Sequence, residues 1–283
     1  MANRKQNGSP TLAGIWRTYR SRILSTMSLL TLERVCAVAI PFVLGLAIND
    51  LVAGSLRGVM VLGGLQLVVL TISVARRLFD TRVYAGIYTD IAWQQAAKQH
   101  LPVSKRAARL QLGRELVDFF EWELPQLVAA VIGIVGALGM LVYLLPSIGL
   151  ACIGVAVLIG MLFFASKQRM FGLNKLLNNE LERQVTMLES LGEHRRRLHL
   201  GRLARWRIHL SDLEARNFAI AELMLAMLLL VVVVIAVRSG RSVGEVFAVL
   251  TYLLDLGEAL IVLPWTYQQS IRMQEIGGRM AAT

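Results

Sequence analysis

The sequence predicts an all-α membrane protein that crosses the bilayer six times. Hydrophobic residues make up 55% of the 283-residue chain, which is more than a soluble domain needs. Several apolar runs reach the roughly 20 residues that a helix needs to cross the hydrocarbon core. The six predicted spans are residues 24–51, 59–74, 124–145, 147–164, 218–237 and 243–265.

The distribution of basic residues predicts the orientation of these spans. The formal net charge is +11, yet only Arg57, Arg238 and Arg241 fall in the loops after spans one and five. Nearly all the others lie in the N-terminal segment and in the segments between spans two and three and between spans four and five. Cytoplasmic segments carry such an excess, so we expect both termini and both long segments in the cytoplasm. The same distribution, with few aromatic residues for stacking on bases, argues against nucleic-acid binding.

The chain ahead of the first span divides into two parts. Residues 1–10 are polar and are expected to be disordered, whereas residues 11–23 form an amphipathic pattern in which Trp16 and Tyr19 alternate with arginines. Such a helix lies in the headgroup plane, so we expect it to form an elbow that leads into span one. Pro41 falls within span one and predicts a kink, because proline removes a backbone donor. No cleavable secretion signal is expected.

Residues 24–268 are predicted to form the transmembrane domain, with two long cytoplasmic helical hairpins at about 76–122 and 165–217 and a cytoplasmic tail at 269–283. Pro102 is expected to break the first hairpin, and the segment from Gly192 to Gly201 the second. A helix of about 45 residues rises about 68 Å, whereas the hydrocarbon core is about 30 Å thick. Each arm of the second hairpin is therefore expected to project roughly 35 Å beyond the membrane.

Charged residues inside the spans are the candidates for a transport site, because burying a charge in a bilayer is costly. Asp255 and Glu258 share one helical face near mid-bilayer, and Glu222 lies at a similar depth. These carboxylates are interpreted as a proton or substrate site. Alternatively, Asp255 or Glu258 pairs with Arg34, or Glu222 reaches the cytoplasmic interface. Glu33 and Arg34 are interpreted as a structural ion pair, with substrate contact as the second option.

No metal or cofactor site is predicted. Cys36 and Cys152 both fall in spans and are interpreted as small apolar residues. The histidines show no metal-ligand spacing and are expected to be exposed to solvent; they are His100, His194, His199 and His209.

An elbow helix, six spans and two long hairpins together resemble the transmembrane domain of ABC exporters. Three local stretches carry the resemblance: residues 99–102 followed by 110–118, residues 192–206, and the sequence from Glu275 to Met280. The resemblance implies a dimer, either a homodimer or a heterodimer with a related chain. It also implies that span six lines a central cavity and that the hairpin tips dock on ATPase domains. The corresponding coupling residues are His100, Pro102, Lys105, Arg106, Arg195, Arg196 and Arg197.

The sequence departs from most exporters because it has no G-x-x-x-x-G-K-[ST] phosphate-binding loop. We therefore expect no ATPase activity from this chain and no bound cofactor. The leading hypothesis is a bacterial inner-membrane transporter that moves a small molecule or peptide by alternating access, driven by a proton gradient or by another source that does not require ATP. The alternative is a transmembrane subunit that works with a separate ATPase subunit, and the third hypothesis is a scaffold or regulatory subunit that transports nothing.

Overall fold

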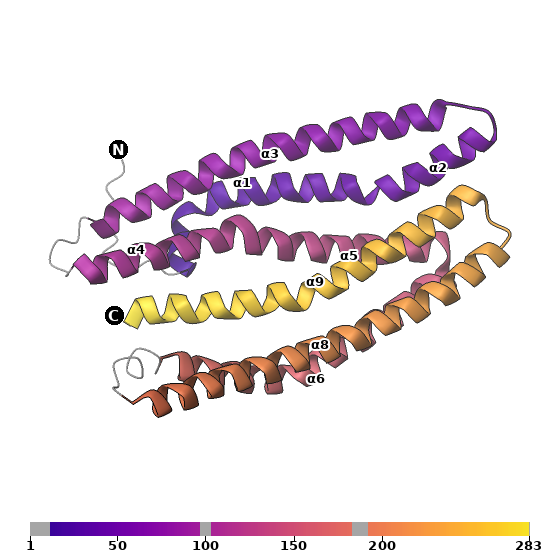
Figure 1. Ribbon diagram of the computed structural model, residues 1–283. Helices are drawn as coiled ribbons and strands as arrows, with labels where there is room; N and C mark the ends of the chain where they lie inside the picture. The colour runs from indigo at the N-terminus through magenta and orange to yellow at the C-terminus, as the bar shows by residue number, and fades with distance from the viewer. Residues whose placement is uncertain (1–11, 97–102, 183–191, 283) are drawn as a thin grey trace. The chain divides into compact units, whose positions relative to one another are not determined.

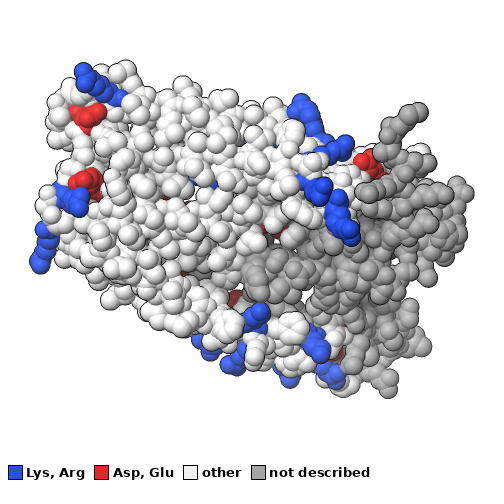
Figure 2. Space-filling view, turned by 180° about the vertical axis from the view of Figure 1, so that it is seen from behind, with Lys and Arg blue, Asp and Glu red and all other residues white. Residues whose placement is uncertain are grey.

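Helices joined by short turns make up the part of the chain that the structure describes (Figure 1). A computed structural model describes residues 12–96, 103–182 and 192–282. Six of its helical stretches are long and apolar enough to cross a membrane, which confirms the predicted number of spans. Figure 2 shows that most of the visible surface carries no charged side chains, and that the visible Lys, Arg, Asp and Glu side chains gather in a few places. A lipid bilayer requires a surface of this kind.

The chain divides into two compact units, which are described separately. The first unit contains residues 1–145 and 236–283, and the second contains residues 146–235. The elements of the first unit are α1 (Leu12–Val38), α2 (Ile40–Val52), α3 (Arg57–Ala96), α4 (Val103–Asp118), the π-helix η1 (Phe119–Glu123), α5 (Leu124–Leu144) and α9 (Val243–Ala282). The elements of the second unit are α6 (Pro146–Glu182) and most of α8 (Glu193–Arg238).

In the first unit, the first predicted span consists of α1 and α2, which are separated by a break at Ala39. Pro41 stands in the first turn of α2, as expected for a residue that begins a helix but cannot continue one. The break frees backbone carbonyl groups, and the hydroxyl of Tyr252 on α9 donates a hydrogen bond of 2.6 Å to that of Val38. The predicted kink is therefore present, and α9 satisfies one of the carbonyls beside it.

The helices of the first unit meet in two different ways. Near one end, large side chains form a hydrophobic core between α1, α3, α4 and η1, in which Ile23, Tyr84 and Leu116 are almost completely buried. Toward the other end, α2 and α9 approach closely at Gly45 and Gly244, where a Cβ on either glycine would clash with the other's backbone. The side chain of Asn49 accepts a hydrogen bond of 2.8 Å from the Gly244 N–H, which holds this close contact in register.

A π-helix occurs where the fourth helix leads into the fifth, at Phe119–Glu123. Pro125 lies in the first turn of α5 and has no N–H to donate to the carbonyl of Glu121, four residues earlier. A π-helical turn is a common response to a lost bond in the α-helical ladder, and such turns are frequent at functional sites. This element was not predicted from the sequence.

In the second unit, α6 and α8 are 37 and 46 residues long. At 1.5 Å per residue they rise about 56 and 69 Å, which is more than a hydrocarbon core of about 30 Å requires. Gly201 lies inside α8, so the expectation of a break that extends to this residue is wrong. Glycine costs only about 1 kcal/mol in a helix interior, which the surrounding good helix formers offset.

The expectation that His199 is exposed to solvent is wrong, because its side chain is only 5% exposed. Its Nδ1 atom lies 2.9 Å from Oε1 of Glu180, across the contact between α8 and α6. The side chains of α6 and α8 that face each other are buried between the two helices. Because this stretch of the sequence is polar, it does not indicate that the two helices pack together. His194 and His209 are exposed as expected, and His100 lies outside the described residues.

Candidate functional site

The first unit contains a cavity of about 880 Å³ lined by residues of α1, α3, η1, α5 and α9. Its charged lining residues are Arg34, Arg76, Arg77, Asp80, Glu121, Asp255 and Glu258. This volume lies within the range of about 300–1,000 Å³ that is common for small-molecule sites. The cavity therefore combines the size of a ligand site with an unusual density of charge for a membrane domain.

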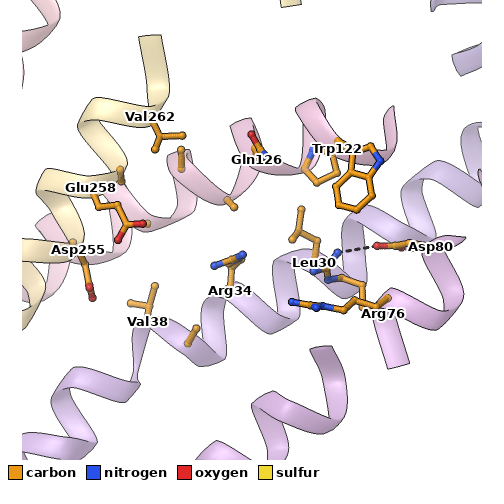
Figure 3. A pocket seen from close by; sticks show the side chains of 18 of the residues that line it. Leu30, Arg34, Val38, Arg76, Asp80, Trp122, Gln126, Asp255, Glu258 and Val262 are labelled. Atoms are coloured by element: carbon orange, nitrogen blue, oxygen red, sulfur yellow. Dashed lines mark hydrogen bonds and ion pairs between the residues drawn. The ribbon is translucent and has the colours of Figure 1, made fainter. Parts of the chain in front are cut away.

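Asp255 and Glu258 come from α9, one helical turn apart, and both line the cavity. In Figure 3 the Glu258 side chain points from α9 toward the middle of the cavity. Both residues are exposed in this unit, and neither forms an ion pair within the described part of the chain. The alternative that one of them pairs with Arg34 does not hold in this structure.

Arg34 lines the same cavity from α1. Figure 3 shows its guanidinium extending toward the space that Glu258 enters from the other side. Among the residues described, it has no acidic partner. The interpretation of Glu33 and Arg34 as an ion pair is therefore wrong. Adjacent residues on a helix point about 100° apart, so their side chains do not face each other.

Glu33 instead belongs to a buried network with Arg76 and Asp80 of α3. The Arg76 Nε–H donates to Oε2 of Glu33, and its NH1 group donates to Oδ2 of Asp80 at 2.8 Å. The three side chains are only 10–13% exposed. The network fixes α1 against α3 and occupies the guanidinium of Arg76. The second carboxylate oxygen of Asp80 is buried without a hydrogen-bond partner in the structure.

The lining is completed by polar and aromatic groups that were not predicted from the sequence. Glu121 and Trp122 come from the π-helix, Gln126 from α5 and Tyr252 from α9. The sequence contained one signal of an additional charged cluster, which was the i, i+4 spacing of Arg76 and Asp80. Glu121 and Trp122 of η1 line the cavity because the π-turn shifts the helical register ahead of Pro125.

Small side chains make the space for this cavity. They line it from three helices and are Ala37, Ala129, Ala130, Gly133, Ala137 and Ala259. At Gly133 an added Cβ would lie 3.7 Å from the Ala259 Cβ, in ordinary van der Waals contact. A larger side chain at these positions would fill part of the volume between α5 and α9.

The remaining predicted residues lie elsewhere. Glu222 is an exposed residue of α8 in the second unit and is not among the residues that line this cavity. Arg197 is exposed near the start of α8, whereas His100 and Pro102 lie outside the described residues. The side chains of four further coupling candidates in α4 and α8 are also outside the described set; they are Lys105, Arg106, Arg195 and Arg196.

The sequence matches one protein family. Residues 12–244 match the family described as the ABC transporter transmembrane region. The match covers most of the chain, from α1 through α8, and stops before Asp255 and Glu258. No curated protein matches the sequence.

Proposed function

Because the chain belongs to the family of ABC transporter transmembrane regions, we propose that it moves a small molecule or a peptide across a membrane by alternating access, with the cavity of the first unit as the substrate site. One observation carries this assignment. The cavity exposes two carboxylates that have no ion-pair partner among the described residues. Unpaired charges within a membrane span are costly, and a binding role accounts for them better than a structural role does.

The depth of these carboxylates agrees with a substrate or ion site. Asp255 lies twelve residues after Val243, the first residue of α9, which corresponds to about 18 Å of helical rise. In a hydrocarbon core of about 30 Å, it falls near the middle and Glu258 falls one turn deeper. Transport by alternating access requires a site that is reached from one side of the membrane at a time, and a position near mid-bilayer suits that requirement.

The same carboxylates support a proton gradient as the energy source. Asp255 and Glu258 lie one helical turn apart and line the cavity together, so they place two groups that can accept and release a proton in one site. In this mechanism a proton binds on one side of the membrane, neutralises the pair, and leaves on the other side after the helices have rearranged.

A second candidate is a transmembrane subunit that works with a separate ATPase subunit. The observation that favours it is the length of α3, α6 and α8, which are 40, 37 and 46 residues. Each is longer than a span requires, so each carries a segment that can reach a partner outside the bilayer. Under this proposal the ends of these segments form cytoplasmic hairpin tips, and the tips transmit the movements of the ATPase.

We further propose that the active form is a dimer, a homodimer or a heterodimer with a related chain, in a bacterial inner membrane with both termini in the cytoplasm. The basic segments support this orientation, since Lys and Arg accumulate on the cytoplasmic side. Chemical cross-linking in native membranes, followed by mass determination of the purified complex, tests the oligomeric state.

The deciding experiment is transport by the purified chain in proteoliposomes, measured with and without an imposed proton gradient. Uptake that depends on the gradient and needs no ATP supports the first mechanism. Transport that appears only when a separate ATPase subunit and ATP are added supports the second. A chain that transports nothing under either condition, and that tolerates Asp255→Asn with Glu258→Gln in cells, is a scaffold, and that outcome overturns the proposed function.

A further inference from the structure

We propose that the cavity binds a zwitterionic solute of about tripeptide size, with its ammonium group at Asp255 and Glu258 and its carboxylate at Arg34. This inference rests on the proposed function, since it assigns a substrate class to the same cavity. The acidic residues of α9 alone would favour a cationic solute. The other charge comes from the opposite wall of the cavity, where α1 contributes an arginine.

The two walls carry opposite charges that do not neutralise each other. Arg34 projects from α1 and Glu258 from α9 into the same space (Figure 3). Within the described residues, neither has an ion-pair partner. Because these two oppositely charged side chains line one cavity without pairing, a ligand can bind between them and contact both.

Arg34 is available to a ligand in a way that Arg76 is not. Arg76 is buried and donates hydrogen bonds to Glu33 and to Asp80. Its charge is therefore balanced by groups of the protein itself. Arg34 is exposed to the cavity and retains the full set of donors of a guanidinium, which suits bidentate recognition of a carboxylate.

Charge complementarity favours a zwitterion over an ion of single charge. A cation at Asp255 and Glu258 leaves Arg34 without a counter-charge in a site of low dielectric constant. An anion at Arg34 leaves both carboxylates uncompensated in the same way. A solute with both groups gives Arg34 and the α9 carboxylates each a counter-charge, whereas a ligand that lacks one group leaves one of these two sites without a counter-charge.

The other lining residues set the size of this solute. The cavity volume of about 880 Å³ accommodates a molecule considerably larger than a single amino acid. Small side chains of α5 line the cavity, and the exposed ring of Trp122 adds aromatic surface for apolar parts of the ligand. Gln126 adds an amide that can donate to or accept from a peptide group.

The test uses one probe in three charge states. Radiolabelled tri-alanine with free termini is the zwitterion, its C-terminal amide is the cation, and its N-acetyl form is the anion. Binding of each to the full chain in lipid nanodiscs is measured by equilibrium dialysis at neutral pH. We expect the zwitterion to bind about tenfold or more tightly than either single-charge form, in line with the cost of an unpaired polar group in a site.

Variants test which protein residues bind each end of the ligand. Arg34→Gln is expected to abolish the preference for the zwitterion over the cation. The double variant Asp255→Asn with Glu258→Gln is expected to abolish the preference for the zwitterion over the anion. Arg17→Gln, an exposed position of α1 that does not line the cavity, is the matched control and should bind like the wild type. The swapped pair Arg34→Glu with Glu258→Arg keeps the net charge and should retain zwitterion binding better than Arg34→Glu alone.

Equal binding of the zwitterion and the cation by the wild type overturns the inference, as does a lack of zwitterion binding. Uptake of the same probes in proteoliposomes separates the two proposals. Charge-selective binding without uptake supports the site and counts against the transport function. Uptake that ignores the charges of the probe supports transport and counts against the zwitterion site.

Discussion

At the scale of single residues, the buried contact of Glu33 with Arg76 is the structural ion pair of this domain. The side chains of Glu33 and Arg76 are 10% and 13% exposed, and removal of the Glu33 charge leaves Asp80 as the carboxylate that pairs with Arg76. Glu33→Gln is therefore expected to destabilise the protein by about 1–3 kcal/mol, the cost of weakening a buried hydrogen bond to a charged group. Thermal unfolding in detergent, followed by loss of monodisperse protein, measures this effect.

The matched control for this variant is Asp118→Asn. Asp118 pairs with Arg114 at 3.9 Å on the same helix turn, and the two side chains are 50% and 64% exposed. Exposed pairs contribute about 0–1 kcal/mol, so this variant should melt close to the wild type. Equal melting temperatures for Glu33→Gln and Asp118→Asn would show that the Glu33 contact adds no stability.

Asp255 and Glu258 give a second residue-scale prediction. Asp255→Asn or Glu258→Gln should abolish proton-dependent uptake in proteoliposomes, because an amide keeps the shape of the side chain but cannot exchange a proton. The variants should remain folded and dimeric, as judged by size-exclusion chromatography. Full gradient-driven uptake by both variants would eliminate the pair as the coupling site.

The sequence located most of these residues but not their partners. A charged residue inside an apolar run can be recognised from the sequence alone, and this is the case for Arg34, Asp255 and Glu258. Arg76 lies at the end of an apolar run and resembles an ordinary interfacial arginine. Its pairing with Glu33, 43 residues earlier, depends on how α1 and α3 are rotated against each other, which no local pattern encodes.

At the scale of helices, the contact of α2 with α9 is a close approach of two backbones. Gly45→Ala and Gly244→Ala are each expected to destabilise the protein by about 1–3 kcal/mol, because the added methyl group would collide with the partner backbone. Gly63→Ala on α3, where the structure leaves open space, is the control and should raise stability slightly through its better helix propensity. Unfolding temperatures of the three variants check this order, and an unchanged melting temperature for Gly244→Ala would contradict the contact.

The extent of each helix was predictable to different degrees. The spans follow from apolar runs, and the break at Ala39 follows from Pro41, because proline acts locally. The π-helix before Pro125 was not predicted, since a missing donor can be accommodated by a kink, a break or a π-turn. Neighbouring helices decide among these outcomes, and here the choice places Glu121 and Trp122 in the cavity lining.

At the scale of the whole molecule, the second unit provides the long helices that the partnered mechanism needs. Replacement of residues 195–197 by alanine removes three positive charges near the start of α8. If an acidic ATPase surface binds there, the variant should release a co-purifying ATPase while the detergent-solubilised chain keeps its elution volume. Pull-downs of the wild-type chain that contain no ATPase would argue against this docking site.

The sequence by itself determined that this chain is a six-span helical membrane protein, because hydrophobicity and helix length are properties of contiguous residues. It also determined that charges lie within the spans. Only the tertiary structure decided which of these charges are neutralised and which face a common cavity. Arg34 and Asp255 are 221 positions apart, and their meeting in one cavity depends on helix rotation and packing. The proposed zwitterionic substrate depends on that arrangement, because a ligand responds to the charges that the fold leaves unpaired.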